Sequence, residues 1–276
     1  MNLIIQGLEV NNSDLRAVAK LVQADGIERI TGQAFRLTNA VYSAEISGYC
    51  AQAELDFAFV DAMRKLSDFK LIAMDMDSTL LAIESIDEIA DMLQIKPQVA
   101  EITLQTMRGE ISFEESLARR TQLLKGLHQD ALQQVYDERV KLNPGAEKML
   151  TQAKQAGLKT MVISGGFTFF TERIKAKLGF DYAAANVLDI ENRHLTGKVA
   201  GEIIGREGKA RVLKQVCDEL GFQREHIIAI GDGANDLGMM AQAGVSIAYH
   251  AKPIVKEHAT YAIDYVGLDG VINLFQ

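Results

Sequence analysis

The chain has 276 residues, of which 48% are apolar and 24% charged. These values are typical of a folded globular protein and exclude a fibrous or disordered one. The formal net charge of −8 at pH 7 argues against binding to nucleic acid or to an anionic membrane, because both require clustered Lys and Arg. A phosphate-bearing ligand would therefore need local positive charge.

The amino end, M-N-L-I-I-Q-G-L, has no basic cluster, and its apolar run is too short for a signal peptide. No later segment approaches transmembrane length. The two cysteines, Cys50 and Cys217, are isolated and predict neither a zinc site nor a disulfide framework. We therefore expect a cytoplasmic protein.

Residues 1–66 predict a small α+β accessory domain with the order strand, helix, strand, strand, helix. The five elements are expected over residues 3–10, 13–22, 30–37, 40–46 and 55–63. This order is similar to part of an ACT-like regulatory module, although no final strand is evident before Leu71.

Short apolar runs predict the strands of a mainly parallel sheet over residues 71–74, 160–163, 227–230, 245–248 and 262–266. The runs are continuous rather than alternating, which is typical of strands buried on both faces. Helices are predicted between them, each ended by a glycine, over residues 146–155, 167–178, 208–220 and 237–243. This alternation predicts a doubly wound, Rossmann-like α/β core over residues 67–83 and 143–276.

Residues 84–142 interrupt the alternation with a long, charged, helix-rich segment, which we call the helical insertion. It leaves directly after the first core strand. An insertion at that point lies over the carboxyl ends of the strands, where ligands bind in such sheets. We expect it to act as a cap.

Residues 187–199 predict a peripheral antiparallel hairpin.

Polar segments follow the predicted strands, at residues 75–79 (D-M-D-S-T), 164–166 (S-G-G), 205–209 (G-R-E-G-K) and 231–236 (G-D-G-A-N-D). Strand ends converge at a switch point, so we expect these segments to meet. Two carboxylates as close in sequence as Asp75 and Asp77 repel unless a cation lies nearby. Four carboxylates supply the oxygen ligands that Mg²⁺ prefers, from Asp75, Asp77, Asp232 and Asp236.

The same segments offer an anion site. The glycines after Ser164 are expected to open a helix, whose free N–H groups can hold an anion, and Lys209 adds positive charge. A carboxylate nucleophile beside these groups suits phosphoryl transfer through an aspartyl-phosphate. Asp75, which ends the strand, is the expected nucleophile, and Asp77 the general acid and base.

Simpler interpretations exist for each segment alone. D-x-D-x-T occurs in calcium loops, but Leu80 and Ile86 stand where an EF-hand needs Gly and Glu. G-R-E-G-K is too short for a nucleotide P-loop, and Ala210 replaces its Ser or Thr. Together, at successive strand ends, the segments favour a catalytic site.

Four segments of residues 70–266 resemble, in this order, the four motifs of the haloacid dehalogenase superfamily of phosphohydrolases. They are D-M-D-S-T, V-I-S-G-G, G-K and G-D-G-A-N-D. The resemblance implies Asp75 as nucleophile and Asp77 as general acid and base. It implies Mg²⁺ bound by the side chains of Asp75 and Asp232 and the backbone carbonyl of Asp77, with Asp236 orienting the metal shell. The implied phosphate-binding residues are Ser164, Gly165, Lys209 and Asn235.

Residues 107–121 of the insertion resemble the helical cap of the phosphoserine phosphatases within this superfamily. By that resemblance Met107 and Phe113 line the pocket, Arg120 binds the substrate carboxylate and Glu84 pairs with its ammonium group. Without it, these side chains would be interpreted as solvated helix charges and bundle core. Arg119 is the adjacent alternative to Arg120.

The implied reaction is Mg²⁺-dependent hydrolysis of O-phospho-L-serine to L-serine and phosphate, the last step of serine biosynthesis. A phosphotransferase to a small alcohol such as homoserine, or a non-catalytic amino-acid-binding regulator, are the alternatives. Asp75 and Asp77 favour an enzyme over the regulator. The accessory domain would serve in homodimerisation, structural support or serine sensing.

Overall fold

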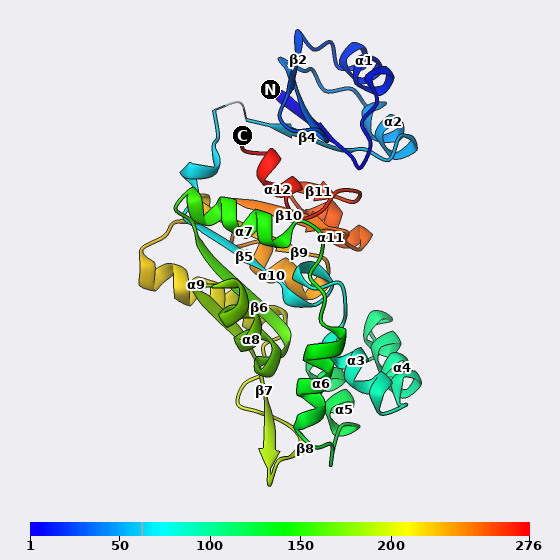
Figure 1. The fold of residues 1–276 in the computed structure, drawn as a ribbon, viewed down its shortest axis with the longest axis vertical. Coiled ribbons are helices and arrows are strands. Elements are labelled where there is room, and N and C mark those ends of the chain that lie inside the picture. The colour runs from blue at the N-terminus through cyan, green and yellow to red at the C-terminus, as the bar shows by residue number, and fades with distance from the viewer. Residues whose placement is uncertain (62) are drawn as a thin grey trace. The chain divides into compact units, whose positions relative to one another are not determined.

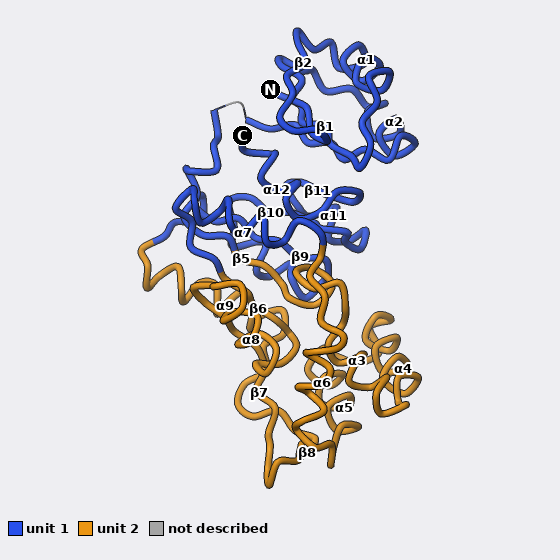
Figure 2. The backbone as a smooth tube through the Cα atoms, viewed as in Figure 1, with its two compact units in different colours: residues 1–72, 144–160, 222–276 blue, residues 73–143, 161–221 orange. Residues whose placement is uncertain are grey.

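A computed structural model describes residues 1–61 and 63–276 (Figure 1). The chain divides into two compact units (Figure 2). Unit 1 consists of residues 1–72, 144–160 and 222–276, and unit 2 of residues 73–143 and 161–221. Residue 62, which belongs to the helix predicted over 55–63, lies outside the described residues. No helix in the described part of the chain is long and apolar enough to span a membrane.

Among the described residues, seven strands form a mainly parallel sheet with the order β11-β10-β9-β5-β6-β7-β8. In unit 1, β10 pairs in parallel with β9 and β11, and in unit 2, β7 pairs in parallel with β6 and antiparallel with β8. The predicted parallel strands and antiparallel hairpin are thus confirmed. The bounds are β5 Leu71–Met74, β6 Lys159–Phe167, β7 Tyr182–Glu191, β8 His194–Ala200, β9 Ile227–Gly231, β10 Val245–Tyr249 and β11 Tyr261–Ile263.

Helices accompany these strands in unit 1, and every residue of β9 and β10 is buried. Full burial explains why the two strands are continuous apolar runs rather than alternating ones. The helices are α7 Ala146–Gln155, α10 Leu237–Met240, α11 Pro253–His258 and α12 Gly270–Asn273.

The amino-terminal part of unit 1 is an antiparallel sheet with the order β2-β3-β1-β4, packed against α1 and α2 around an apolar core that includes Leu3, Ile5 and Leu37. The bounds are β1 Asn2–Gln6, α1 Asn12–Leu21, β2 Gly26–Arg29, β3 Ala34–Thr38, α2 Ile46–Gln52 and β4 Asp56–Val60. The resulting order β-α-β-β-α-β is that of ferredoxin-like folds.

Two predictions in this part are wrong. Residues 40–46 do not form a strand, and the residues predicted as a helix over 55–63 contain the strand β4. Burial alternates along Asp56–Val60, as the period of a half-buried strand requires, and its Phe and Val residues favour a strand. β4 is also the final strand that the sequence did not reveal.

The helical insertion in unit 2 folds into four helices, and two more helices belong to the same unit. Backbone hydrogen bonds join the insertion to the β8 hairpin: Gly126 N–H donates to the Leu195 carbonyl and Leu195 N–H to that of Leu127. The helices are α3 Ser85–Met92, α4 Lys96–Met107, α5 Phe113–Gln122, α6 Asp130–Arg139, α8 Thr168–Leu178 and α9 Arg206–Leu220.

Candidate active site

Asp75 lies at the end of β5, a strand whose four residues are all buried. The chain then makes a tight turn, Met76–Leu80, in which Ser78 adopts a φ of 58°. Asp75 Oδ1 accepts a hydrogen bond of 2.7 Å from the Met76 N–H. This turn holds the side chains of Asp75 and Asp77 in fixed places on a rigid strand end.

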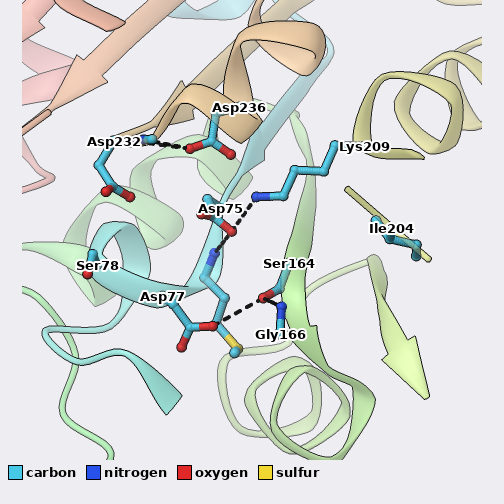
Figure 3. Close-up of polar contacts among 12 residues, drawn as sticks. Asp75, Asp77, Ser78, Ser164, Gly166, Ile204, Lys209, Asp232 and Asp236 are labelled. Atoms are coloured by element: carbon cyan, nitrogen blue, oxygen red, sulfur yellow. Dashed lines mark hydrogen bonds and ion pairs between the residues drawn. The ribbon is translucent and has the colours of Figure 1, made fainter. Parts of the chain in front are cut away.

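Lys209 forms an ion pair with Asp75, with 2.6 Å between Nζ and Oδ1 (Figure 3). The lysine side chain is fully buried and that of Asp75 is 7% exposed. A buried ammonium is stable only beside negative charge, so Asp75 compensates the charge of Lys209, and Lys209 brings a positive charge to this strand end.

The segment 205–209, predicted to follow a strand, comes after β8, which ends at Ala200, and Lys209 lies within the helix predicted over 208–220. It occupies the first turn of α9, where its N–H donates to the Gly205 carbonyl. The position is more rigid than a loop, because the helix fixes the backbone from which the side chain projects.

Asp77 is buried and lies among hydroxyl groups. The Ser85 N–H donates to Oδ1 at 2.9 Å, while the hydroxyls of Ser85 and Ser164 lie 3.2 and 3.3 Å from Oδ2. The pKa of Asp77 is raised to about 7: burial raises it most and the charge of Glu84 adds to this, whereas the Ser85 hydrogen bonds and Lys209 lower it. A carboxyl group with this pKa can both give and take a proton near neutral pH.

Ser164 and the two glycines after it do not open a helix, contrary to the prediction. They belong to β6, and α8 begins only at Thr168. The segment is instead an irregular strand end with a hydrogen bond of its own: Gly166 N–H donates to Ser164 Oγ at 2.8 Å. A Cβ atom at Gly166 would lie 2.7 Å from Asp77 Oδ2, so the approach of these segments requires glycine.

Two of the predicted substrate-binding residues lie near Asp77. Glu84 Oε1 accepts a hydrogen bond of 2.6 Å from the Ser78 hydroxyl. Arg120 is partly buried, and burial lowers its pKa while Asp87, Glu84 and Asp77 raise it. The charges of these three acidic side chains therefore act on its guanidinium group.

The other insertion residues differ in their surroundings. Arg119, the alternative to Arg120, is exposed and hydrogen-bonds to Glu115 and Gln105. Phe113 contacts the chain at Gly205, where an added Cβ would lie 2.9 Å from its ring, whereas Met107 is 63% exposed. Arg120 is thus the more buried of the two arginines.

The loop after β9 in unit 1 carries Asp232, Asn235 and Asp236. Asp236 is fully buried, and its Oδ2 accepts the N–H groups of Asp232 and Gly233 at 3.1 and 3.0 Å. Asp232 and Asn235 are partly exposed. Asp236 therefore fixes the loop that presents Asp232.

Asp75, in unit 2, and Asp232 and Asp236, in unit 1, each offer carboxylate oxygens. These are the hard ligands that suit Mg²⁺.

Comparison with known proteins decides the family. A family model described as haloacid dehalogenase-like hydrolase matches residues 69–244. The chain belongs to the haloacid dehalogenase-like hydrolases. A second family model, a domain of unknown function (DUF4072), matches residues 3–45.

Relatives of this hydrolase include a phosphoserine phosphatase of Polaromonas sp. (strain JS666), 52% identical over 76% of this chain and 91% of the relative. A solved structure of a HAD-family hydrolase from Salmonella enterica serovar Typhi has a TM-score of 0.90 at 32% identity, covering 100% of this chain and 98% of that one. A phospho-aspartyl intermediate analogue of phosphoserine phosphatase has a TM-score of 0.71 at 39% identity, covering 75% and 99%.

Two residues of this hydrolase escaped the sequence analysis. Ser85 binds Asp77 through both its N–H and its hydroxyl, and nothing in the sequence distinguishes it from a helix-start serine. Asn186 lies within a largely apolar run of β7, and a polar amide in such a strand is a signal that could have been noticed.

Proposed function

We propose that this chain hydrolyses O-phospho-L-serine to L-serine and inorganic phosphate through a phosphorylated Asp75. One observation carries the proposal: a buried carboxylate at a strand end is paired with a buried lysine, beside a second carboxylate whose pKa is about 7. The names of its relatives support the substrate. In this arrangement of described residues, Asp75 would be the nucleophile, Asp77 the proton carrier and Lys209 the fixed positive charge.

The reaction has two steps. A carboxylate oxygen of Asp75 attacks phosphorus, the bond to the serine oxygen breaks, and that oxygen takes a proton from Asp77. Asp77 then removes a proton from water as the water attacks phosphorus, and phosphate leaves Asp75. The raised pKa of Asp77 suits both directions of proton transfer.

The phosphoryl group would be held by the Ser164 hydroxyl, the Gly165 N–H, Lys209 and Asn235. Because the transferred group carries spread negative charge, such donors stabilise it most in the transition state. Mg²⁺ would be held by the side chains of Asp75 and Asp232 and the carbonyl of Asp77, with Asp236 as the loop-fixing residue. When bound, the ion neutralises charge on the phosphoryl oxygens.

The serine end of the substrate would be recognised by residues of the insertion. Arg120 is suited to bind a carboxylate in a bidentate manner, and Glu84 to pair with an ammonium group. Phe113 and Met107 would cover the pocket. Exclusion of water by this cap strengthens the charge interactions beneath it.

The organisation of the chain follows from this assignment. Residues 1–66 would form an accessory domain, 67–83 and 143–276 the catalytic core, and 84–142 the cap. The enzyme would act in the cytoplasm without nucleic acid, and the accessory domain would support a homodimer.

Release of inorganic phosphate from O-phospho-L-serine, with Mg²⁺ or with EDTA, tests the proposal. We expect rapid, metal-dependent release, much faster than from phosphothreonine or a sugar phosphate. Turnover of another ester with no turnover of phosphoserine would contradict the substrate. Phosphate recovered on an added alcohol rather than in solution would contradict hydrolysis.

A further inference from the structure

Asn186, on β7 in unit 2, is a buried amide with no assigned role. It is 1% exposed. Its Nδ2 donates to the carbonyls of Gly165 at 2.9 Å and Ile204 at 3.4 Å, and its Oδ1 accepts the Ile204 N–H at 2.7 Å. The side chain thus connects the backbones of two segments that are far apart in sequence.

The first of these segments is the irregular end of β6. The pairing of β6 with β7 shifts register here: β6 advances from Ile163 to Phe167 while β7 advances only from Ala184 to Asn186. The residues of β6 in between, 164–166, therefore bulge out of the ladder and lose regular strand partners. The Asn186 amide replaces one of those partners by binding the Gly165 carbonyl.

The second segment leads into α9. Ile204 directly precedes Gly205, whose carbonyl accepts the Lys209 N–H in the first turn of the helix. Because Lys209 is buried against Asp75, a shift of Ile204 moves the turn that aims the lysine. The Asn186 side chain binds both backbone polar groups of Ile204, the carbonyl and the N–H, as a neighbouring strand would.

We infer that Asn186 is a positioning residue that sets the separation between the 164–166 bulge and Lys209, and so determines the affinity of the site for a tetrahedral oxyanion. The inference rests on the proposed function, which assigns phosphate binding to these two segments. Asn186 itself touches neither substrate nor reacting atoms. Displacements of about 1 Å in such constellations cost up to about a hundredfold in rate.

The test uses Asn186→Leu in the full chain with Mg²⁺. This change keeps the approximate size of the side chain and adds no charge that would repel an anion, but removes the hydrogen bonds to Gly165 and Ile204. We expect the Kd for orthophosphate, measured by calorimetry, to rise about tenfold. We also expect kcat/KM to fall by the same factor for O-phospho-L-serine and p-nitrophenyl phosphate, because only the shared phosphoryl end is affected.

Thr196→Val is the matched control. Thr196 hydrogen-bonds Asp189 in the same β7–β8 hairpin, away from the bulge, so its loss should leave the Kd for orthophosphate unchanged. If Asn186→Leu does not fold, Asn186→Gln, with the same amide one methylene further out, is measured in its place.

The outcomes separate the two proposals. A folded Asn186 variant whose Kd for orthophosphate stays within about twofold of the intact protein would overturn the inference. So would a loss of kcat/KM confined to phosphoserine, or failure of the intact protein to bind orthophosphate. If the intact protein binds orthophosphate and the variant binds it weakly, but phosphoserine is not hydrolysed, the inference stands and the proposed substrate falls.

Discussion

Two buried carboxylates, Asp77 in unit 2 and Asp56 in unit 1, differ in what surrounds them. Burial raises the pKa of both. Asp56 accepts the backbone N–H groups of Asp264, Tyr265 and Val266 at 2.6, 3.1 and 3.0 Å. Asp77 has one backbone donor, and its other neighbours are hydroxyls, Glu84 and Lys209.

The difference separates Asp56 from Asp77, the residue that we propose as general acid and base. Fixed amide donors cannot exchange protons with a ligand, so Asp56 serves to hold β4 to the segment after β11. Hydroxyls rotate and can accept as well as donate, so Asp77 can change protonation without losing its partners. Burial alone does not distinguish the two roles.

The largest effect on turnover is expected at the nucleophile. Asp75→Asn should lower phosphate release from O-phospho-L-serine by at least about a thousandfold, because the amide cannot form the covalent intermediate. Asp218→Asn makes the same substitution in unit 2 at an exposed side chain that pairs with Lys214 and should leave the rate unchanged. Appreciable turnover by Asp75→Asn would remove Asp75 from the mechanism.

A smaller effect, selective for substrate, is expected at Arg120. Arg120→Leu should raise the KM for O-phospho-L-serine about 10- to 100-fold, the value of a hydrogen-bonded charge contact. For p-nitrophenyl phosphate, which has no carboxylate, KM should barely change.

Arg119→Leu is the matched control for this prediction, since Arg119 is exposed and bonded within the insertion. Equal effects of the two substitutions would contradict a specific role of Arg120. A larger effect at Arg119 would assign the carboxylate contact to Arg119 instead.

A pH shift is expected at Ser85, with a change in rate of only a few-fold. The hydrogen bond from its hydroxyl lowers the pKa of Asp77, so Ser85→Ala, which keeps the backbone N–H donor but removes the hydroxyl, should raise that pKa. Because Asp77 must be protonated to release serine, kcat/KM falls as pH rises through this pKa, and the alkaline limb of the profile should move to higher pH.

Ser112→Ala, which removes the hydroxyl that caps α5, is the control. An alkaline limb that stays in place or moves to lower pH would argue against this role of Asp77.

At Asp56 we expect a loss of stability with no change in turnover per folded molecule. Asp56→Ala leaves three backbone N–H groups without their acceptor, which should lower the free energy of unfolding by about 3 kcal/mol. Denaturant unfolding and phosphate release on the same sample measure both quantities. A variant that is as stable as the intact protein but has impaired turnover would contradict the purely structural role of Asp56.

Prediction from the sequence succeeds where one local pattern has one structural solution. Continuous apolar runs such as Ile227–Ile230, bounded by polar and glycine-rich segments, could scarcely be anything but buried strands. The motif residues near Asp75 carry their chemistry in their side-chain types, so the groups of the candidate site could be proposed without coordinates.

It fails where tertiary contacts decide. Residues 55–63 have no helix-breaking residue that would exclude a helix, and the alternating burial along Asp56–Val60 decides in favour of the strand β4. The S-G-G segment looks like a helix start, but its pairing with β7 keeps it in β6. The roles of Ser85 and Asn186 depend on partners distant in sequence or on side-chain direction, neither of which a local pattern contains.

The most direct test of the account is to find where phosphate is held during turnover. The protein is mixed with O-phospho-L-serine and Mg²⁺, quenched in acid within the first turnover, digested, and its peptides are analysed by mass spectrometry. We predict a hydroxylamine-labile phosphoryl group on Asp75, absent from Asp75→Asn. A phosphoryl group on another residue, or turnover with no phosphorylated peptide at any quench time, would contradict the aspartyl-phosphate mechanism.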